Sequence, residues 1–447
     1  MRRVLALATL GTFLSHASPM AVHAGGPEVS RVTLENGLRL VLSQQTSVPI
    51  VAIDCLVDGG ARVDPVDRPG LAALTASLLE EGTEGRTSQD IALLIDSLGG
   101  SFETGGSSDW IYASSAVLSR DFETGVDLVS KSLRVPTFAP DAVERIRADT
   151  LGDIQSAEEN PGYVSMRGFR KALFGDAPYG HPVEGTSESL RAITRDEIVR
   201  FHGTWIRPER TICAIVGDVE PAKMESVARE KLSAWARGGP APEPSPATAK
   251  PATAVLIDMA TTQANVVVGQ IGVARENPDF FAIRLMNHIL GGGGFTSRLV
   301  NRVRDAHGLA YSVGSSFDSS RFAGPFQVVL QTKVESAGEA IRLVREEIEK
   351  LHDQGATEEE LHAAQDYLTG NFPQNLDSTA KLAGLLAQIE YFGLGDDYIE
   401  KYGERVRAVT LEEVRDAARE YLHPDALVQV VVGPEELLAS QGLAEDR

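Results

Sequence analysis

Apolar residues along the chain follow two periods, one typical of strands and one typical of helices. Residues 110–118 alternate between apolar and polar positions, and residues 50–57 form a nearly continuous apolar run, so both segments are predicted to be strands. An Asn36-Gly37 pair predicts a hairpin within residues 31–42. Three further segments are predicted to be helical: 70–80, 88–98 and 141–158. The pattern predicts an α+β fold, with helices packed on mostly antiparallel sheets.

The chain repeats this pattern. Residues 190–198 match residues 406–414, and each segment contains a Thr-x-x-Glu capping box that opens a helix. Pro208 then matches Pro424, and Gly217 matches Gly433, with 216 residues separating the members of each pair. A long repeat of this kind indicates duplication of a whole domain rather than an array of small units.

A stretch rich in proline and small residues separates the two halves. Residues 237–252 have a composition that cannot form a core, and we interpret them as a semi-extended linker. The predicted boundaries are therefore residues 25–236 for the first domain and 253–447 for the second.

The first 24 residues have the form of a secretory signal peptide. Arg2 and Arg3 precede a short apolar stretch, and the small-residue exit is Val22-His23-Ala24. We therefore expect a secreted protein, located in the periplasm if the source is bacterial. No later segment is long and apolar enough to span a bilayer, so no membrane insertion is expected after cleavage.

The charge of the chain argues against some classes of binding partner. The formal net charge is −21 at pH 7, which argues against binding to nucleic acid or to anionic membranes. Cys55 and Cys213 each lie in an apolar, strand-like run. An oxidising compartment permits a disulfide between them, but two buried free thiols in neighbouring strands satisfy the sequence equally well.

One stretch in the second half carries candidate chemistry. Four glycines, Gly291 to Gly294, predict a mobile loop, and Thr296 or Ser297 is suited to cap the following helix. Leu299 and Val303 lie one helical turn apart and can face a core. Gly308 is expected to end the helix just before a strand over residues 309–317.

That reversal brings Arg304, in the last helical turn, close to Tyr311, at the start of the strand. A guanidinium and a phenol at one point form a donor pair suited to a peptide carbonyl or its oxyanion. A structural interpretation stands beside this one, because arginine is favoured near a helix C-terminus and strand tyrosines often serve packing.

Three segments in order resemble the signatures of one family: residues 59–83, residues 179–185 and residues 297–313. They resemble the pitrilysin, insulin-degrading enzyme and mitochondrial processing peptidase family, over about residues 29–434. The resemblance implies two homologous α+β halves that close like a clam shell. Active members of this family are zinc peptidases with His-x-x-Glu-His on a helix of the first half and a distal glutamate downstream.

The zinc motif is missing here. Ala73 and Ser77 occupy the histidine positions, Ala76 occupies the position of the general base, and Asp153 lies near the distal ligand position. Alanine cannot ligate a metal and serine is a poor neutral ligand, so we expect no zinc in this chain.

Arg304 and Tyr311, seven residues apart, match the family's pair that binds the substrate carbonyl. The family includes bacterial heterodimers in which one chain carries zinc and the other carries this pair. The resemblance therefore implies a metal-free subunit, inactive alone, that binds peptide together with a paralogous partner carrying the zinc. A peptide-binding or structural homologue with no role in catalysis is the alternative. An autonomous hydrolase with relocated residues is disfavoured, since no other catalytic pattern is present.

Overall fold

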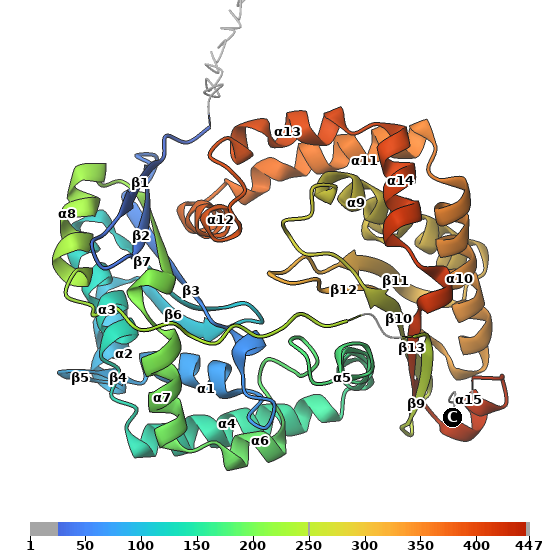
Figure 1. The fold of residues 1–447 in the computed structure, drawn as a ribbon, viewed down its shortest axis with the longest axis horizontal. Helices are drawn as coiled ribbons and strands as arrows, with labels where there is room; N and C mark the ends of the chain where they lie inside the picture. The colour runs from blue at the N-terminus through green and yellow to red at the C-terminus, as the bar shows by residue number, and fades with distance from the viewer. Residues whose placement is uncertain (1–25, 249–250, 444–447) are drawn as a thin grey trace, which may run out of the picture.

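The computed structural model describes residues 26–248 and 251–443, and each half of the chain contains one large β-sheet (Figure 1). The first sheet has six strands, in the spatial order β1 (Ser30–Thr33), β2 (Arg39–Gln44), β8 (Thr211–Gly217), β3 (Ile50–Asp58), β7 (Trp110–Leu118) and β6 (Ser101–Gly106). The second has five, in the order β9 (Thr253–Asp258), β13 (Val428–Gly433), β10 (Gln263–Ile271), β12 (Pro325–Lys333) and β11 (Ala310–Phe317). A short ribbon pairs β4 (Gly82–Thr83) with β5 (Arg86–Thr87).

The two sheets have the same topology, which confirms the duplication. Without β1, the order β2-β8-β3-β7-β6 of the first sheet is repeated as β9-β13-β10-β12-β11 in the second. The pairs β2–β8 and β9–β13 are parallel, and the remaining pairs within the two sheets are antiparallel. The α+β prediction and the hairpin at Asn36-Gly37 are both confirmed.

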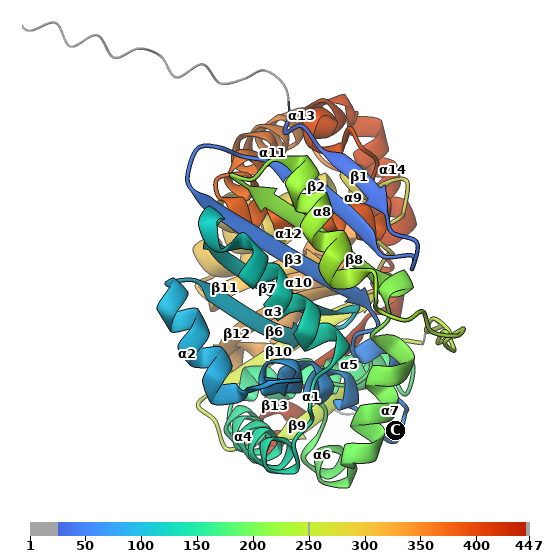
Figure 2. The same cartoon turned by 90° about the vertical axis from the view of Figure 1, so that its left-hand side faces the viewer.

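Helices pack on the sheets, and some of them lie between the two sheets (Figures 1 and 2). Those of the first half are α1 (Leu71–Ser77), α2 (Ser88–Leu98), α3 (Phe122–Arg134), α4 (Pro140–Glu158), α5 (Pro161–Phe174), α6 (Ser187–Ala192), α7 (Arg195–Trp205) and α8 (Pro221–Leu232). Those of the second are α9 (Phe280–Asn287), α10 (Ala337–Gln354), α11 (Glu358–Asn371), α12 (Thr379–Phe392), α13 (Tyr398–Ala408), α14 (Leu411–Tyr421) and α15 (Glu435–Ala439). The two predicted capping boxes open α7 and α14, where Thr194 and Thr410 each accept a backbone N–H.

The halves exchange one helix each across the space between the sheets. Helix α12 of the second half packs on β3 and β8 of the first sheet, while α5 of the first half packs on β10 and β13 of the second (Figure 1). Buried residues of α12 join the inner face of the first sheet in one continuous core, and Phe169 of α5 packs with Val267 and Val430. Burial of apolar surface therefore stabilises the association of the two halves.

A buried polar network crosses the same boundary. The Asp109 carboxylate, at the start of β7, accepts a hydrogen bond from the Tyr179 hydroxyl at 2.6 Å and from the Arg321 N–H at 2.9 Å. Tyr391 of α12 donates to Asp58 Oδ1 at 2.9 Å, and the fully buried Arg62 guanidinium pairs with Asp58 and with Glu243 of the linker. Each half thus supplies groups that satisfy buried polar atoms of the other.

The segment Tyr179-Gly180-His181-Pro182 has a structural role at this boundary. Tyr179 has a φ of 73°, which is strained for a tyrosine, and its hydroxyl also accepts the Phe322 N–H at 3.1 Å. A side chain on Gly180 would collide with the Gly175 carbonyl at 2.2 Å. His181 contacts the Pro182 carbonyl through Nδ1 at 2.9 Å.

The open question about the cysteines is answered by a bond between them. Cys55 of β3 and Cys213 of β8 lie directly opposite each other in the antiparallel register and form a disulfide. The predicted signal peptide lies outside the described residues. Within 26–248 and 251–443, no helix has the length and apolar character needed to cross a bilayer.

Removing the disulfide should destabilise the first half without changing its fold. The bond joins residues 158 positions apart in the sequence, and the chain-entropy model gives such a link up to about 5 kcal/mol. We expect the Cys55→Ala/Cys213→Ala double variant to unfold at lower urea concentration than the wild type, as measured by circular dichroism. Dithiothreitol should lower the wild-type midpoint and leave that of the double variant unchanged; a wild-type midpoint insensitive to reductant would contradict the assignment.

Candidate functional site

Arg304 lies in an irregular helix. The helix begins at Arg298 and winds as a π-helix from Val300 to Ala306, rather than as the regular helix the sequence suggested. Leu299 and Val303 are fully buried, as predicted. Single π-turns recur at functional sites because they shift side chains out of the regular helical register.

The glycine run before this helix is more ordered than a mobile loop. Gly291 and Gly292 belong to a second π-helical turn, His288–Gly292, so the loop prediction was wrong for these two residues. Close packing explains the glycine at position 291, because a side chain there would meet the Ser315 backbone nitrogen at 2.6 Å. The capping prediction was also wrong, since the hydroxyls of Thr296 and Ser297 donate backwards to the carbonyls of Gly293 and Gly294.

The chain reverses at Gly308 and then bulges at Tyr311. Gly308 has a φ of 64°, and its N–H donates to the Arg304 carbonyl at 2.9 Å, as in a glycine-terminated helix. In β11, Ala310 pairs with Thr332 and Ser312 pairs with Gln331, so Tyr311 is the extra residue of a β-bulge. A bulge breaks the alternation of the strand and redirects one side chain; here it leaves Tyr311 88% exposed.

These two irregularities bring Arg304 and Tyr311 together. The guanidinium carbon of Arg304 lies 5.8 Å from the centre of the Tyr311 ring and 4.8 Å from that of Phe295, which is 74% exposed. Arg304 has a single ion-pair partner among the described residues, the exposed Asp305 at 3.7 Å. Within the same residues the Tyr311 hydroxyl has no hydrogen-bond partner, so both donors are available to a ligand.

The residues at the former metal positions do not fit a zinc ion. Ala73 and Ser77 share the less buried face of α1, whereas Ala76 is fully buried, and Asp153 lies exposed on α4. Across residues 26–248 and 251–443, no group of three or more His, Cys, Asp or Glu side chains is arranged to hold a metal ion. None of the three α1 side chains is a good zinc ligand, and one carboxylate alone does not form a zinc site.

Local hydrogen bonds maintain α1 without a metal. The Asp64 carboxylate accepts the N–H groups of Gly70 and Ala72 at 2.7 and 2.8 Å, which caps the start of the helix. The Thr104 hydroxyl of β6 donates to the Ala76 carbonyl at 2.9 Å. Burial raises the pKa of Asp64, and the two N–H donors oppose that rise.

Comparison with known proteins assigns the family. Residues 39–187 match the model described as insulinase (peptidase family M16), and residues 192–368 match the model described as peptidase M16 inactive domain. An uncharacterized zinc protease of Mycobacterium leprae is 30% identical over 400 residues, covering 88% of this chain and 89% of that protein. The chain belongs to peptidase family M16.

Two other similar proteins bear on whether the chain is a peptidase. A protein named non-peptidase homolog in Helicobacter pylori is 22% identical over 433 residues, covering 97% of this chain and 98% of that protein. The crystal structure of a peptidase M16 inactive domain from Pseudomonas fluorescens is 29% identical, with a TM-score of 0.87, covering 91% of this chain and 98% of that one. The two-domain M16 fold expected from the sequence motifs is confirmed.

Asp54 is a partly buried acid that faces the space between the two halves and that the sequence did not single out. It lies on the inner face of β3, and a side chain on Gly384 of α12 would come within 3.1 Å of its Oδ2 atom. Burial, and secondarily the negative charge of Glu103, raise the pKa of Asp54 from 3.8 to about 6. In the sequence, Asp54 could have been noticed as the one acid within an otherwise apolar strand. Phe295 could have been noticed as an aromatic residue directly after four glycines.

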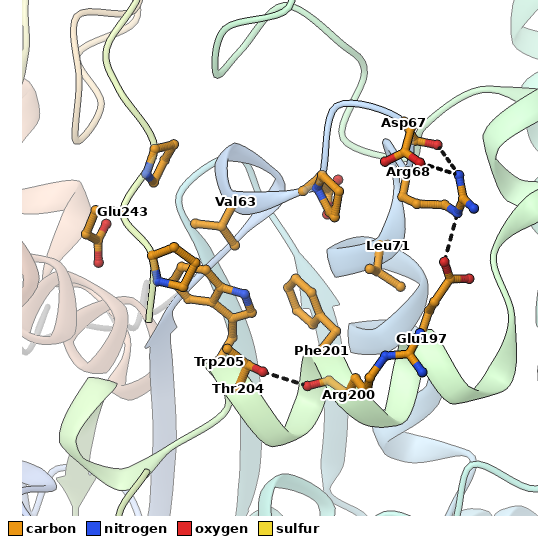
Figure 3. A pocket seen from close by; sticks show the side chains of 14 residues that line it. Val63, Asp67, Arg68, Leu71, Glu197, Arg200, Phe201, Thr204, Trp205 and Glu243 are labelled. Carbon is orange, nitrogen blue, oxygen red and sulfur yellow. Dashed lines mark hydrogen bonds and ion pairs between the residues drawn. The ribbon is translucent and has the colours of Figure 1, made fainter. Parts of the chain in front are cut away.

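A separate pocket of about 510 Å³ lies between the start of α1, helix α7 and residues 242–244 (Figure 3). Phe201 and Trp205 of α7 form its apolar part, and Arg68 pairs with Glu197 at its edge at 3.0 Å. Glu243 of the linker lines it while pairing with Arg210 at 2.6 Å. Neither Arg304 nor Tyr311 lines this pocket, and residues 242–244 form one side of it.

Neutralising Asp54 should stabilise the protein at neutral pH. The folded-state pKa is raised, so ionisation is easier in the unfolded chain and stability falls as pH rises from about 4 to about 6. We expect Asp54→Asn to raise the free energy of unfolding at pH 7 by about 1–3 kcal/mol and to flatten its pH dependence in that window. Urea unfolding at several pH values measures both effects. Asp96→Asn, at an exposed position of α2, is the control and should change neither; a destabilised Asp54→Asn protein would contradict the prediction.

Proposed function

We propose that this chain is the non-catalytic, metal-free subunit of a heterodimeric zinc endopeptidase. In this proposal it presents Arg304 and Tyr311 to a peptide held at the zinc site of a paralogous partner. The observation that carries the proposal is the convergence of two donors: the phenol of the exposed Tyr311, and the half-buried Arg304 guanidinium, whose one ion pair, with Asp305, is 3.7 Å long. A tyrosine that served packing alone would be expected to lie buried.

The proposed chemistry is divided between the two chains. The partner supplies the zinc ion and its bound water, because the α1 helix of this chain has no side chains suited to them. Arg304 and the Tyr311 hydroxyl donate hydrogen bonds to the carbonyl oxygen of the scissile bond as negative charge develops there. Phe295 packs against the Arg304 guanidinium and limits its motion.

The disulfide supports the proposed location. A bonded cysteine pair persists in oxidising compartments, in agreement with secretion directed by residues 1–24. The division of the chain into a first domain to residue 236, a linker over 237–252 and a second domain from residue 253 is part of the same proposal.

A second candidate function is peptide binding or assembly with no role in catalysis. The absence of suitable zinc ligands at positions 73, 76 and 77 is compatible with it, and so is the name of the Helicobacter pylori relative. The two candidates differ in one respect, which is whether Arg304 and Tyr311 affect the rate at a partner's zinc site.

Substitution of the donor pair should slow a reconstituted heterodimer while leaving its assembly intact. We expect Arg304→Ala and Tyr311→Phe each to lower kcat/KM by about 100- to 1,000-fold, the usual effect of losing one oxyanion donor. The measurement is cleavage of a fluorogenic peptide by this chain mixed with a paralogue that carries His-x-x-Glu-His.

The control is Arg342→Ala in α10. The Arg342 side chain is 56% exposed and pairs with Glu339 and Glu346. Its rate should equal that of the wild type. Gel filtration should show the same complex for all variants. Full activity of an assembled Arg304→Ala heterodimer would favour the non-catalytic alternative, and cleavage by the isolated chain would contradict both candidates.

A further inference from the structure

The second half contains a small polar pocket that the proposed function does not use. It has a volume of about 230 Å³ and lies between helices α9 and α11, beside the glycine run. The polar side chains that line it are Arg284, Asn287, His288, Tyr367, Asn371 and Asn375. Leu368 and Phe372 form an apolar wall.

In the duplicated fold, this pocket lies at the helix pair equivalent to the one that carries the former metal positions. Helix α9 follows β10 as α1 follows β3, and α11 follows α10 as α4 follows α3. Helices α1 and α4 carry the former metal positions of the first half and contact each other, as α9 and α11 do in the second. The second half therefore has a polar pocket at the helix pair that corresponds to the one carrying Ala73 and Ala76 in the first half.

Several polar side chains of the pocket have no partner among the described residues, and of these His288 is buried while the others face solvent. His288 is only 8% exposed, and its ring has no hydrogen-bond partner among the described residues; it packs on the Tyr367 ring at 4.7 Å. Within the same residues, the side chains of Arg284, Asn371 and Asn375 also have no hydrogen-bond or ion-pair partner. Such donors, gathered in one depression, are suited to a ligand that accepts several hydrogen bonds.

The charge of the pocket specifies the kind of acceptor. None of the described residues lining it is acidic, although the chain has a formal net charge of −21. Arg284 is held over the Tyr402 ring, 5.6 Å from its centre, and Tyr402 stacks on Phe372 at 3.8 Å. A guanidinium without an ion-pair partner among the described residues, beside amide donors, matches the planar, two-oxygen geometry of a carboxylate.

The size of the pocket specifies the rest of the ligand. Sites for whole small molecules are typically about 300–1,000 Å³, so this pocket suits the end of a longer chain. We propose that it binds the C-terminal carboxylate of a peptide, with Arg284 as the main anion contact and Leu368 and Phe372 against the last side chain.

The chain connects this pocket directly to the site formed by Arg304 and Tyr311. Gly292 lines the pocket, and Phe295, three residues later, packs on the Arg304 guanidinium. Three residues span at most about 11 Å. A peptide whose end is held at Arg284 therefore has its preceding residues close to Phe295 and Arg304.

The test uses the isolated full chain and needs no partner or catalysis, so its failure is separable from failure of the proposed heterodimer function. The probe is an N-terminally fluorescein-labelled Gly-Ser-Ala-Leu-Ala-Ala-Leu-Ala peptide, compared with the same peptide carrying a C-terminal amide. Fluorescence anisotropy at pH 7 gives both affinities. We expect the free acid to bind at least about tenfold more tightly than the amide, as for a charge-assisted contact.

Two substitutions and one control locate the effect. Arg284→Gln should abolish the difference between acid and amide, and Asn371→Asp should do so by placing a negative charge in the pocket. Arg419→Gln, at an exposed arginine of α14 outside the pocket, should retain the full difference. Thermal melting verifies that each variant is folded.

Three results would overturn the proposal. The first is equal binding of acid and amide by the wild-type chain. The second is a preference for the acid that survives in folded Arg284→Gln and Asn371→Asp proteins. The third is competition by N-acetylalanine as strong as that by the unlabelled peptide, which would show that a free carboxylate suffices without a peptide chain.

Discussion

The exchange of helices α5 and α12 is the interaction on which the rest of the structure depends. Each helix belongs to one half in sequence but buries its apolar face on the sheet of the other half. The apolar surface that α12 buries lies on the first sheet, and the apolar surface that α5 buries lies on the second. Burial of this surface therefore couples the two halves. This coupling sets the spacing of the two halves and hence the position of every group that faces the space between them (Figure 1).

Buried polar contacts give this apolar coupling a specific geometry. Asp109 and Asp58 of the first half are satisfied by the Arg321 N–H and the Tyr391 hydroxyl of the second, and Arg62 joins them to Glu243 of the linker. A buried charge without partners is costly, so the closed arrangement is favoured over one in which the halves slide. The signature segments 59–64 and 179–182 are explained by this network and by the capping of α1, independently of any metal.

The two halves started from the same fold and now differ in their chemistry. At the helix pair α1 and α4, the first half has small or exposed residues and a cap provided by Asp64. At the equivalent pair α9 and α11, the second half has a polar pocket, and the half-buried Arg304 and exposed Tyr311 follow it in the chain. Both features of the second half suit acceptor groups of a peptide, namely carbonyl and carboxylate oxygens, and neither requires a metal in this chain.

The sequence by itself determined the α+β class, the duplication, most element boundaries and the loss of the zinc ligands, because these follow from local periodicity, capping residues and side-chain identity. The predicted segments 88–98 and 110–118 coincide with α2 and β7. Only the tertiary structure decided the Cys55–Cys213 bond, the exposure of Tyr311 and the pocket at Arg284. A strand register, a β-bulge and a π-turn are set by packing against neighbouring elements, and a pattern read along one segment carries no record of those neighbours.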